Sequence, residues 1–342
     1  MVEAICKEIE LKKHFLSNAL IDTIYFGGGT PSVLANRQLN EIVQKIFSTY
    51  SISKNVEFTL EANPEDLTID KIAFWKKVGI NRFSIGIQSF QYDSLKWMNR
   101  NHSKTDSLTG IKRIQDLGIE NISIDLIYGL PNLSNDLWKS EIQTAIKLGV
   151  PHISSYCLTV EEKTALGNHV KTGRAEPVSD ELSESQLLIL MKEMELAGYE
   201  HYEISNFCKP SYESRHNSNY WKGVAYIGIG PGAHSYNLIN RQYNISNNTE
   251  YIKGIAKGEI PFTEEILTKE DNFNEYILTR LRTKWGISLN ELVQFNPPHL
   301  IKIQKLLLNY TENGFISETK GIYILTHKGK LLADEITLQL MQ

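Results

Sequence analysis

Short strand-like segments recur along the first half of the chain at intervals of about 30 residues, the length of one βα unit. Segments with helical periodicity connect them, and two of these connections end at Gly118 and Gly149, as helices often do. Such alternation predicts an α/β fold with a parallel sheet, either open or closed into a barrel. The expected strands are residues 23–26, 56–60, 82–87, 122–128 and 152–158, and the expected helices are residues 39–47, 70–78, 108–118 and 138–149.

A different pattern begins near Glu265. Thr268 is placed to cap a helix that runs to Leu281, and two further helical segments, a hairpin-like segment and a last helix follow. This order is similar to that of a winged helix, so DNA binding is one interpretation. Residues 265–342 contain nine Lys/Arg and nine Asp/Glu, however, and this balance favours a packing or lid role. The expected domains are residues 1–262 and 263–342.

The charge and the cysteines of the chain indicate which partners and which cellular location to expect. The chain has a formal net charge of -4, which supplies no basic field to recruit nucleic acid. It has no run of about 18 apolar residues, and residues 1–16 predict an amphipathic helix rather than a signal peptide or a transmembrane segment. Cys6, Cys157 and Cys208 lie far apart, which argues against a disulfide framework and favours a cytoplasmic location.

Polar residues and glycines stand where the expected strands end. Ligands of parallel α/β proteins bind at the carboxyl ends of strands, so these positions are candidates for binding. Each one has an ordinary structural explanation, such as a tight turn, a helix cap or a neighbouring ion pair. Together they predict one polar pocket suited to a nucleoside-like ligand. The positions are Gly27, Gly28, Gly29 and Thr30 after the first strand, Glu61 after the second, Gln88 after the third, and Asp125 and Tyr156 in the fourth and fifth.

Arg100 is a further candidate. It precedes a helical connection, and its planar guanidinium could clamp a carboxylate. An exposed, solvated arginine is the alternative. A sugar-phosphate-binding barrel that uses the glycine loop as an anion site also remains open at this point.

Seven segments, in order, resemble one known family. They are similar to the oxygen-independent coproporphyrinogen oxidase group of radical S-adenosylmethionine enzymes, and most of all to its heme chaperone branch. The resemblance covers almost the whole chain. It implies a partial (β/α) TIM-like barrel of the radical S-adenosylmethionine type with a small winged-helix-like C-terminal domain. The segments are YFGGGTPS, EANPEDLT, GINRFSIGIQSF, MNRNHS, IDLIYGLP, SSYCLTVEEKTAL and HNSNYWKGVAYIGIGPGAHSY.

The resemblance also implies which residues bind cofactors. His216 in HNSNYW would bind heme iron, with Tyr220 and Trp221 offering flat apolar surface to a porphyrin. A structural histidine beside two core aromatics is the alternative. The residues implied to contact S-adenosylmethionine are Gly28, Gly29, Thr30, Glu61, Gln88, Arg100 and Asp125.

One family motif is missing from the sequence. The family holds a [4Fe–4S] cluster on a C-x3-C-x2-C motif at the end of the first barrel strand, and this chain has no such motif. Either the chain is an N-terminally incomplete version of a longer protein, or it is a natural relative without a cluster. We expect the former, with the cluster cysteines and the first strand encoded upstream of Met1, and therefore no metal ligands within this chain.

The implied function is that of a heme chaperone, which binds heme and passes it to an unknown acceptor protein. A membrane-associated acceptor is one option, whereas nucleic acid is not an expected partner. The enzymatic alternative is oxygen-independent coproporphyrinogen III oxidase, which decarboxylates propionate side chains in porphyrin biosynthesis.

Overall fold

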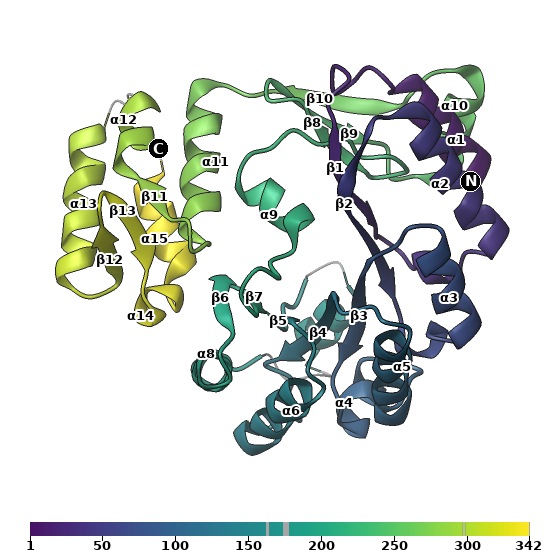
Figure 1. Cartoon of the computed structure of the whole chain (residues 1–342). Helices are drawn as coiled ribbons and strands as arrows, with labels where there is room; N and C mark the ends of the chain where they lie inside the picture. The colour runs from purple at the N-terminus through teal and green to yellow at the C-terminus, as the bar shows by residue number, and fades with distance from the viewer. Residues whose placement is uncertain (162–163, 174–177, 296, 298, 342) are drawn as a thin grey trace. The chain divides into compact units, whose positions relative to one another are not determined.

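The computed structural model describes residues 1–161, 164–173, 178–295, 297 and 299–341, so two residues of the SSYCLTVEEKTAL segment, Glu162 and Lys163, lie outside it. Backbone contacts group the chain into two compact units, between which it passes several times. The first unit contains residues 1–25, 33–58 and 214–342, and the second contains residues 26–32 and 59–213. Figure 1 labels the elements of both.

A mostly parallel sheet runs through the chain, and its part from the end of β2 onwards forms the framework of the second unit. In the described residues this sheet has seven strands, in the order β1-β2-β3-β4-β5-β7-β6. β2 to β5 pair in parallel, whereas β7 is antiparallel to both β5 and β6. The α/β fold predicted from the alternating pattern is therefore confirmed. The strands are β1 (Ile21–Phe26), β2 (Ile52–Ala62), β3 (Arg82–Gln88), β4 (Ile122–Tyr128), β5 (His152–Cys157), β6 (Glu200–Glu203) and β7 (Asn206–Cys208).

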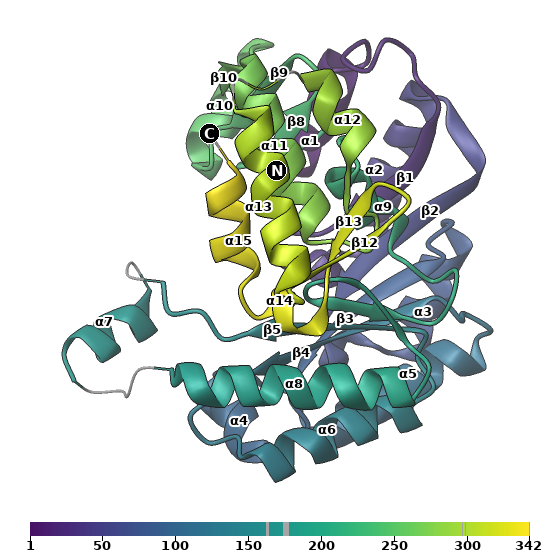
Figure 2. The same cartoon turned by 90° about the vertical axis from the view of Figure 1, so that its left-hand side faces the viewer.

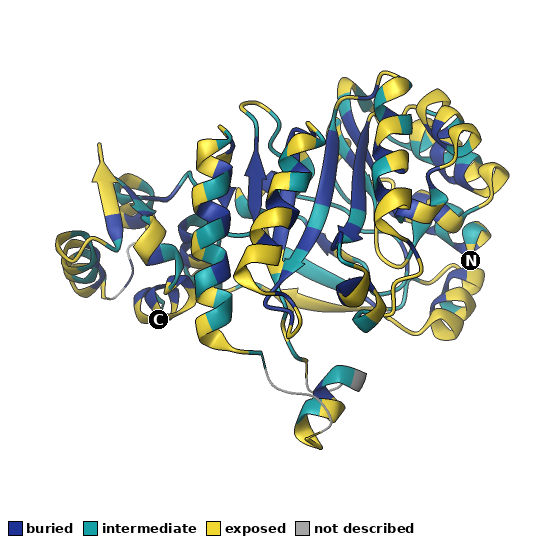
Figure 3. Cartoon of the chain, turned by 90° about the horizontal axis from the view of Figure 1, so that it is seen from below, coloured by how far each residue is buried: buried dark blue, intermediate teal, exposed yellow. Residues whose placement is uncertain are grey.

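The sequence of β3 explains why one face of this sheet is polar. Phe83, Ile85 and Ile87 are fully buried, and they alternate with Ser84 and Gln88. Successive side chains of a strand point to opposite faces, so the apolar set turns towards the helices and the polar set towards the other face. Figure 3 shows such buried central strands beside helices whose outer surfaces are exposed. The polar face is the one that carries the candidate site.

The helices of the second unit begin where the sequence places hydroxyl side chains. Thr68, Ser103 and Ser134 each accept a backbone N–H from the first turn of the helix that follows. Such caps typically stabilise a helix by about 1 kcal/mol. α8 packs along α6 and against β4 (Figure 2). The helical segments are η2 (Pro64–Asp66), α3 (Ile69–Lys77), α4 (Tyr92–Trp97), α5 (Lys104–Asp116), α6 (Asn135–Lys147), α7 (Ala165–Lys171) and α8 (Asp180–Leu196).

The first unit combines the early helices with the last third of the chain. It includes β1 and most of β2, and in the described residues it also contains two small sheets with strand orders β10-β9-β8 and β11-β13-β12. Its elements before Glu265 are α1 (Val2–Leu11), α2 (Asn36–Thr49), α9 (Arg215–Trp221), β8 (His234–Tyr236), β9 (Asn240–Asn244) and α10 (Asn248–Lys257), and η1 (Pro31–Val33) lies at the boundary of the two units.

The elements that follow agree with the order expected from the sequence. Thr268 caps α11 in a capping box with Asp271, and helices and a hairpin succeed it. The winged-helix likeness and a domain boundary at residue 263 stay predictions. The elements are β10 (Phe262–Ile266), α11 (Lys269–Leu281), β11 (Ile287–Ser288), α12 (Leu289–Phe295), α13 (Leu300–Glu312), β12 (Ile316–Thr319), β13 (Ile322–Leu325), α14 (His327–Lys330) and α15 (Ala333–Leu340).

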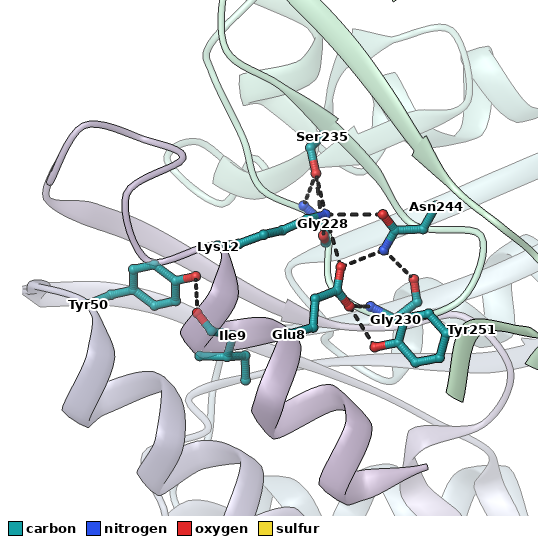
Figure 4. Close-up of polar contacts among 9 residues, drawn as sticks. All are labelled: Glu8, Ile9, Lys12, Tyr50, Gly228, Gly230, Ser235, Asn244 and Tyr251. Carbon is teal, nitrogen blue, oxygen red and sulfur yellow. Dashed lines mark hydrogen bonds and ion pairs between the residues drawn. The ribbon is translucent and has the colours of Figure 1, made fainter. Parts of the chain in front are cut away.

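A buried ion pair fixes α1 within the first unit (Figure 4). Glu8 is 0% exposed and Lys12 is 4% exposed, and the two side chains meet at 3.0 Å. Glu8 also accepts hydrogen bonds from Gly230 N–H at 2.7 Å, Asn244 Nδ2 at 2.6 Å and the Tyr251 hydroxyl at 2.6 Å. A buried charge is stable only when it is paired and hydrogen-bonded in this way. The network therefore joins α1 to the glycine-rich segment that follows α9.

No helix in the described part of the chain is long and apolar enough to cross a membrane.

Candidate functional site

The three consecutive glycines form the loop that leaves β1. Gly28 and Gly29 have φ values of +75° and +66°, a backbone region that glycine enters without the steric penalty of other residues. A Cβ added to either residue would meet no atom within 4 Å, so the requirement for glycine is conformational rather than steric. The loop ends at Ser32, whose Oγ donates to Asp66 at 2.7 Å. Its exposed main chain is thus held in a fixed path, and Thr30 follows on the same loop.

Glu61, near the end of β2, turns towards this loop. Its Oε2 accepts the Gly28 N–H at 3.1 Å. Asp125 on β4 lies within the electrostatic reach of Glu61: burial first, and then the Glu61 carboxylate, raise the pKa of Asp125 to about 7. The positive charge of Arg100 acts on Asp125 in the opposite direction. The structure therefore places Gly28 and Glu61 in contact and Asp125 within reach of the charges of Glu61 and Arg100, while a binding role for these residues stays a prediction.

Gln88 occupies an irregular position at the end of β3. Its φ is +67°, which is rare for a residue other than glycine, and the pairing of β3 with β4 shifts register between Ile85 and Gln88. A Cβ on Gly86 would lie 2.9 Å from Gln88 Nε2 and 4.0 Å from Asn63 Oδ1. The Gln88 side chain thus folds back over Gly86 towards the residue that follows β2. This places it at the same edge of the sheet as Glu61.

A buried carboxylate from α6 holds the segment after Gln88. Glu141 is 0% exposed, and its Oε1 accepts the Ser89 hydroxyl, the Phe90 N–H at 2.9 Å and the Gln91 N–H at 3.2 Å. Burial raises the pKa of Glu141 to about 7, although these hydrogen bonds favour the charged form. Glu141 acts on the site through Ser89 and Gln91, so it is a positioning residue.

Two residues of β5 complete the polar edge. Ser154 is buried, its hydroxyl donates to Asn206 Oδ1 at 2.9 Å, and its nearness to Asp125 acts to lower the pKa of that carboxyl. Burial and then the charge of Asp125 raise the pKa of Tyr156 to about 12. The sequence placed Tyr156 on this rim but gave no reason to choose Ser154. The parallel pairing of Asp125 with Ser154 is the missing information, because it depends on strand register.

His216 lies in the first unit, near the start of α9. Its Nδ1 is 3.0 Å from Thr23 Oγ1 on β1, and its Nε2 is 3.0 Å from the Tyr220 hydroxyl one helical turn later. Its ring stacks on Tyr25 with centroids 4.8 Å apart and an interplanar angle of 23°. Tyr220 meets the ring edge-on at 5.1 Å. The imidazole is thus set among aromatic surfaces, with a hydroxyl at each ring nitrogen.

The backbone of α9 is anchored by Glu57 on β2. Glu57 is 5% exposed and accepts the N–H groups of Arg215 at 3.0 Å and His216 at 2.9 Å, which lack partners within the helix. Ser214 caps the same helix through the Asn217 N–H at 3.3 Å. Sequence reasoning did not select Thr23, Tyr25 or Glu57. All three belong to strands almost 160 residues or more before His216, and no local pattern connects them.

The described residues do not provide a cluster site. They contain no group of three or more His, Cys, Asp or Glu side chains that could hold a metal ion. All three cysteines are free, and Cys6 belongs to the first unit whereas Cys157 and Cys208 belong to the second. A [4Fe–4S] cluster therefore does not fit the side chains described.

Comparison with known proteins identifies the family. The model of the radical SAM superfamily matches residues 7–144. The heme chaperone HemW of Bacillus subtilis (strain 168) is 36% identical over 92% of this chain and 84% of its own length. The chain belongs to the HemW family. HemW of Lactococcus lactis subsp. lactis (strain IL1403) is also 36% identical, over 78% of this chain and 70% of its own length.

A solved structure confirms the architecture. The radical SAM enzyme coproporphyrinogen III oxidase (HemN) from Escherichia coli superposes with a TM-score of 0.85, covering 99% of this chain and 82% of that chain. Sequence identity is 18%, so this match shows the fold alone. The partial barrel of the radical SAM type predicted from the sequence is confirmed, as is the resemblance to the heme chaperone branch. Membership of this superfamily implies S-adenosylmethionine and a [4Fe–4S] cluster as the family's cofactors.

Proposed function

We propose that this HemW-family chain is a heme chaperone, which binds heme with His216 as an iron ligand and passes it to an acceptor protein in the cytoplasm. The observation that carries the proposal is the setting of His216. The ring is fixed on one side by Thr23 and Tyr25, and it stands beside the half-exposed Tyr220. An oriented imidazole beside flat aromatic surface suits an iron porphyrin. The proposed acceptor is a protein, and a membrane-associated protein would also fit this role.

The residues at the polar edge of the second unit support a site for S-adenosylmethionine. Glu61 and Asp125 offer negative charge to an ammonium or sulfonium group, and Arg100 offers positive charge to a carboxylate. Gly28 and Gly29, followed by Thr30, let a ligand approach the main chain, and the Gln88 amide lies over Gly86 at the same edge of the sheet. When bound, S-adenosylmethionine supplies a sulfonium-activated adenosyl group. The residues present thus match both charges of its amino acid end.

Hemin titration of the purified protein tests the heme assignment. We expect a shifted Soret band that is lost in His216→Ala and kept in His14→Ala, an exposed histidine of the same unit. Retention of the band and the affinity in His216→Ala would contradict the assignment. The same protein is expected not to convert coproporphyrinogen. Turnover to protoporphyrinogen would instead identify a coproporphyrinogen III oxidase.

Calorimetry tests the second site. A specific response to S-adenosylmethionine, weakened in Glu61→Gln, is expected. A response to sugar phosphates in its place would point to an anion-binding barrel.

A further inference from the structure

Both ring nitrogens of His216 have hydrogen-bonding partners, and the two partners belong to different kinds of element. Thr23, the partner of Nδ1, belongs to β1, a strand of the large sheet. Tyr220, the partner of Nε2, belongs to the last turn of a seven-residue helix and is 41% exposed. One contact is therefore built into the sheet, whereas a single side-chain rotation can break the other.

Proton counting relates these contacts to ligand binding. A neutral imidazole carries one N–H, so one ring nitrogen donates and the other accepts. The Tyr220 phenol has one O–H that it can donate, and it lies 3.0 Å from Nε2. If Nδ1–H donates to Thr23 Oγ1, then Nε2 accepts from Tyr220. In this arrangement the lone pair on Nε2, which a metal needs, points at the Tyr220 hydroxyl 3.0 Å away.

We propose that Thr23 and Tyr220 make His216 an exchangeable heme ligand: Thr23 Oγ1 accepts from Nδ1–H in the tautomer that presents Nε2, and the Tyr220 hydroxyl holds Nε2 until iron displaces it. This inference rests on the heme function proposed above. The exchange involves no redox change, since the Nε2 lone pair passes from the phenol proton to iron and Tyr220 retains its proton. Return of the phenol to Nε2 assists release, as a protein that hands heme on requires.

The remaining contacts agree with this division of roles. Glu57 holds the backbone N–H of His216 at 2.9 Å and Tyr25 holds the ring face, so His216 stays in place when Tyr220 leaves. The Tyr220 ring packs edge-on against Tyr226 with centroids 4.6 Å apart. Tyr220 must break its hydrogen bond to His216 before it can rotate away, and its contact with Tyr226 opposes the same movement. Donation of the other ring nitrogen to a fixed acceptor is also how ligating histidines are commonly oriented.

Hemin affinity of the full protein and its variants tests the proposal. Tyr220→Phe removes the competing hydroxyl but keeps the ring, so we expect hemin to bind about 2- to 10-fold more tightly and to dissociate more slowly. Thr23→Val removes the Nδ1 acceptor without changing the side-chain shape, so we expect weaker binding by a similar factor, restored in Thr23→Ser. Tyr243→Phe, which removes a phenol bonded to Glu265 at 2.6 Å, is the matched control and should change nothing.

Two results would overturn the inference. Unchanged affinity in Tyr220→Phe would show that the hydroxyl does not compete with iron. Weaker binding with an altered Soret band would make Tyr220 itself an iron ligand. Near-ultraviolet circular dichroism of each variant separates both from a folding defect. If either result occurs while His216→Ala loses hemin binding, His216 is still the heme ligand and only the exchange with Tyr220 is wrong. If His216→Ala keeps hemin binding, His216 is not the heme ligand, and the proposed function fails as well.

Discussion

The two units differ in the hydrogen bonds and charges that surround their buried carboxylates. In the first unit Glu8 accepts from Gly230, Asn244 and Tyr251 beside Lys12, and Glu57 accepts two helix N–H groups. In the second unit Asp125 lies near the like charge of Glu61, and burial opposes its ionisation. Glu141 there has one oxygen, Oε2, that is buried and has no hydrogen-bond partner within the described chain.

This difference teaches what each region is built to do. Fully compensated carboxylates hold segments in place, as Glu57 does for the helix that bears His216. We propose that Asp125, whose ionisation is opposed by burial and by the charge of Glu61, is suited to a cationic ligand, because a positive charge relieves both effects. Glu141 positions a segment of the second unit, so the contrast between the units concerns Asp125 and its neighbour Glu61 above all.

The largest effect is expected for Glu141→Gln. The folded pKa of Glu141 is raised to about 7, so the fold favours its protonated form and loses stability as pH rises from about 4.5 to 7. Glutamine does not titrate, so the free energy of unfolding of Glu141→Gln should fall by about 2 to 3 kcal/mol less over this pH range than that of the unmodified protein. Urea unfolding at several pH values measures this difference. Glu195→Gln, an exposed glutamate of α8, is the control. An unaltered pH slope in Glu141→Gln would break the contrast between the units.

Glu57→Ala comes next. It leaves the N–H groups of Arg215 and His216 without their buried acceptor, so the free energy of unfolding should fall by about 2 kcal/mol. Hemin affinity should fall as well, because α9 loses its anchor. Glu57→Gln keeps one acceptor oxygen and should recover part of both losses. If chemical denaturation shows no change in Glu57→Ala, the first unit is not positioned by this acid.

A smaller effect is expected for S-adenosylmethionine binding as a function of pH. Because the raised pKa of Asp125 is about 7, the carboxylate form declines below that pH. Affinity should therefore fall by up to about tenfold, or about 1.4 kcal/mol, for each pH unit below 7. Calorimetric titrations between about pH 6 and 8 measure this. Asp125→Asn should bind more weakly at the upper end and show a flat profile, and a profile as steep as that of the unmodified protein would exclude Asp125 as its source.

The smallest effect is expected for Gly28→Ala. A Cβ there meets no neighbour, so the cost is that of the left-handed backbone, about 1 kcal/mol, and S-adenosylmethionine affinity should fall about fivefold. Gly314→Ala tests a glycine with a nearly equal positive φ, +73° against +75°, and equally open surroundings, but in the first unit. It should lower stability equally without altering affinity. Equal affinity losses in both variants would mean that the loop has no specific part in binding.

The sequence predicted the candidate site best where polar residues recur at the carboxyl end of successive strands. Glu61, Gln88 and Asp125 could be predicted to share one edge because the carboxyl ends of parallel strands do so, and their part in binding stays a prediction. Ser154 was not found, since its contact with Asp125 depends on pairing register. The left-handed Gln88 was also unexpected, because the bulge that produces it follows from tertiary pairing rather than from residue preference.

His216 shows the other limit of sequence reasoning. Its importance came from resemblance to a family, and no periodicity pointed to its partners. Thr23 and Glu57 reach it from strands that the chain forms long before α9. Hydrogen bonds over such separations follow from the completed fold and leave no local pattern.

The network around Glu8 also bears on how the protein is made. Glu8 is bonded to Tyr251, which lies 243 residues later in the chain. At the usual pace of translation, about 5 to 20 residues per second, roughly 10 to 50 s pass between the emergence of the two from the ribosome. Throughout that interval the burial site of Glu8 is incomplete, whereas all strands of the second unit have been synthesised before the interval ends. We therefore expect the second unit to fold before α1 is buried. In a nascent chain stalled shortly before Asn244, α1 should remain accessible to protease.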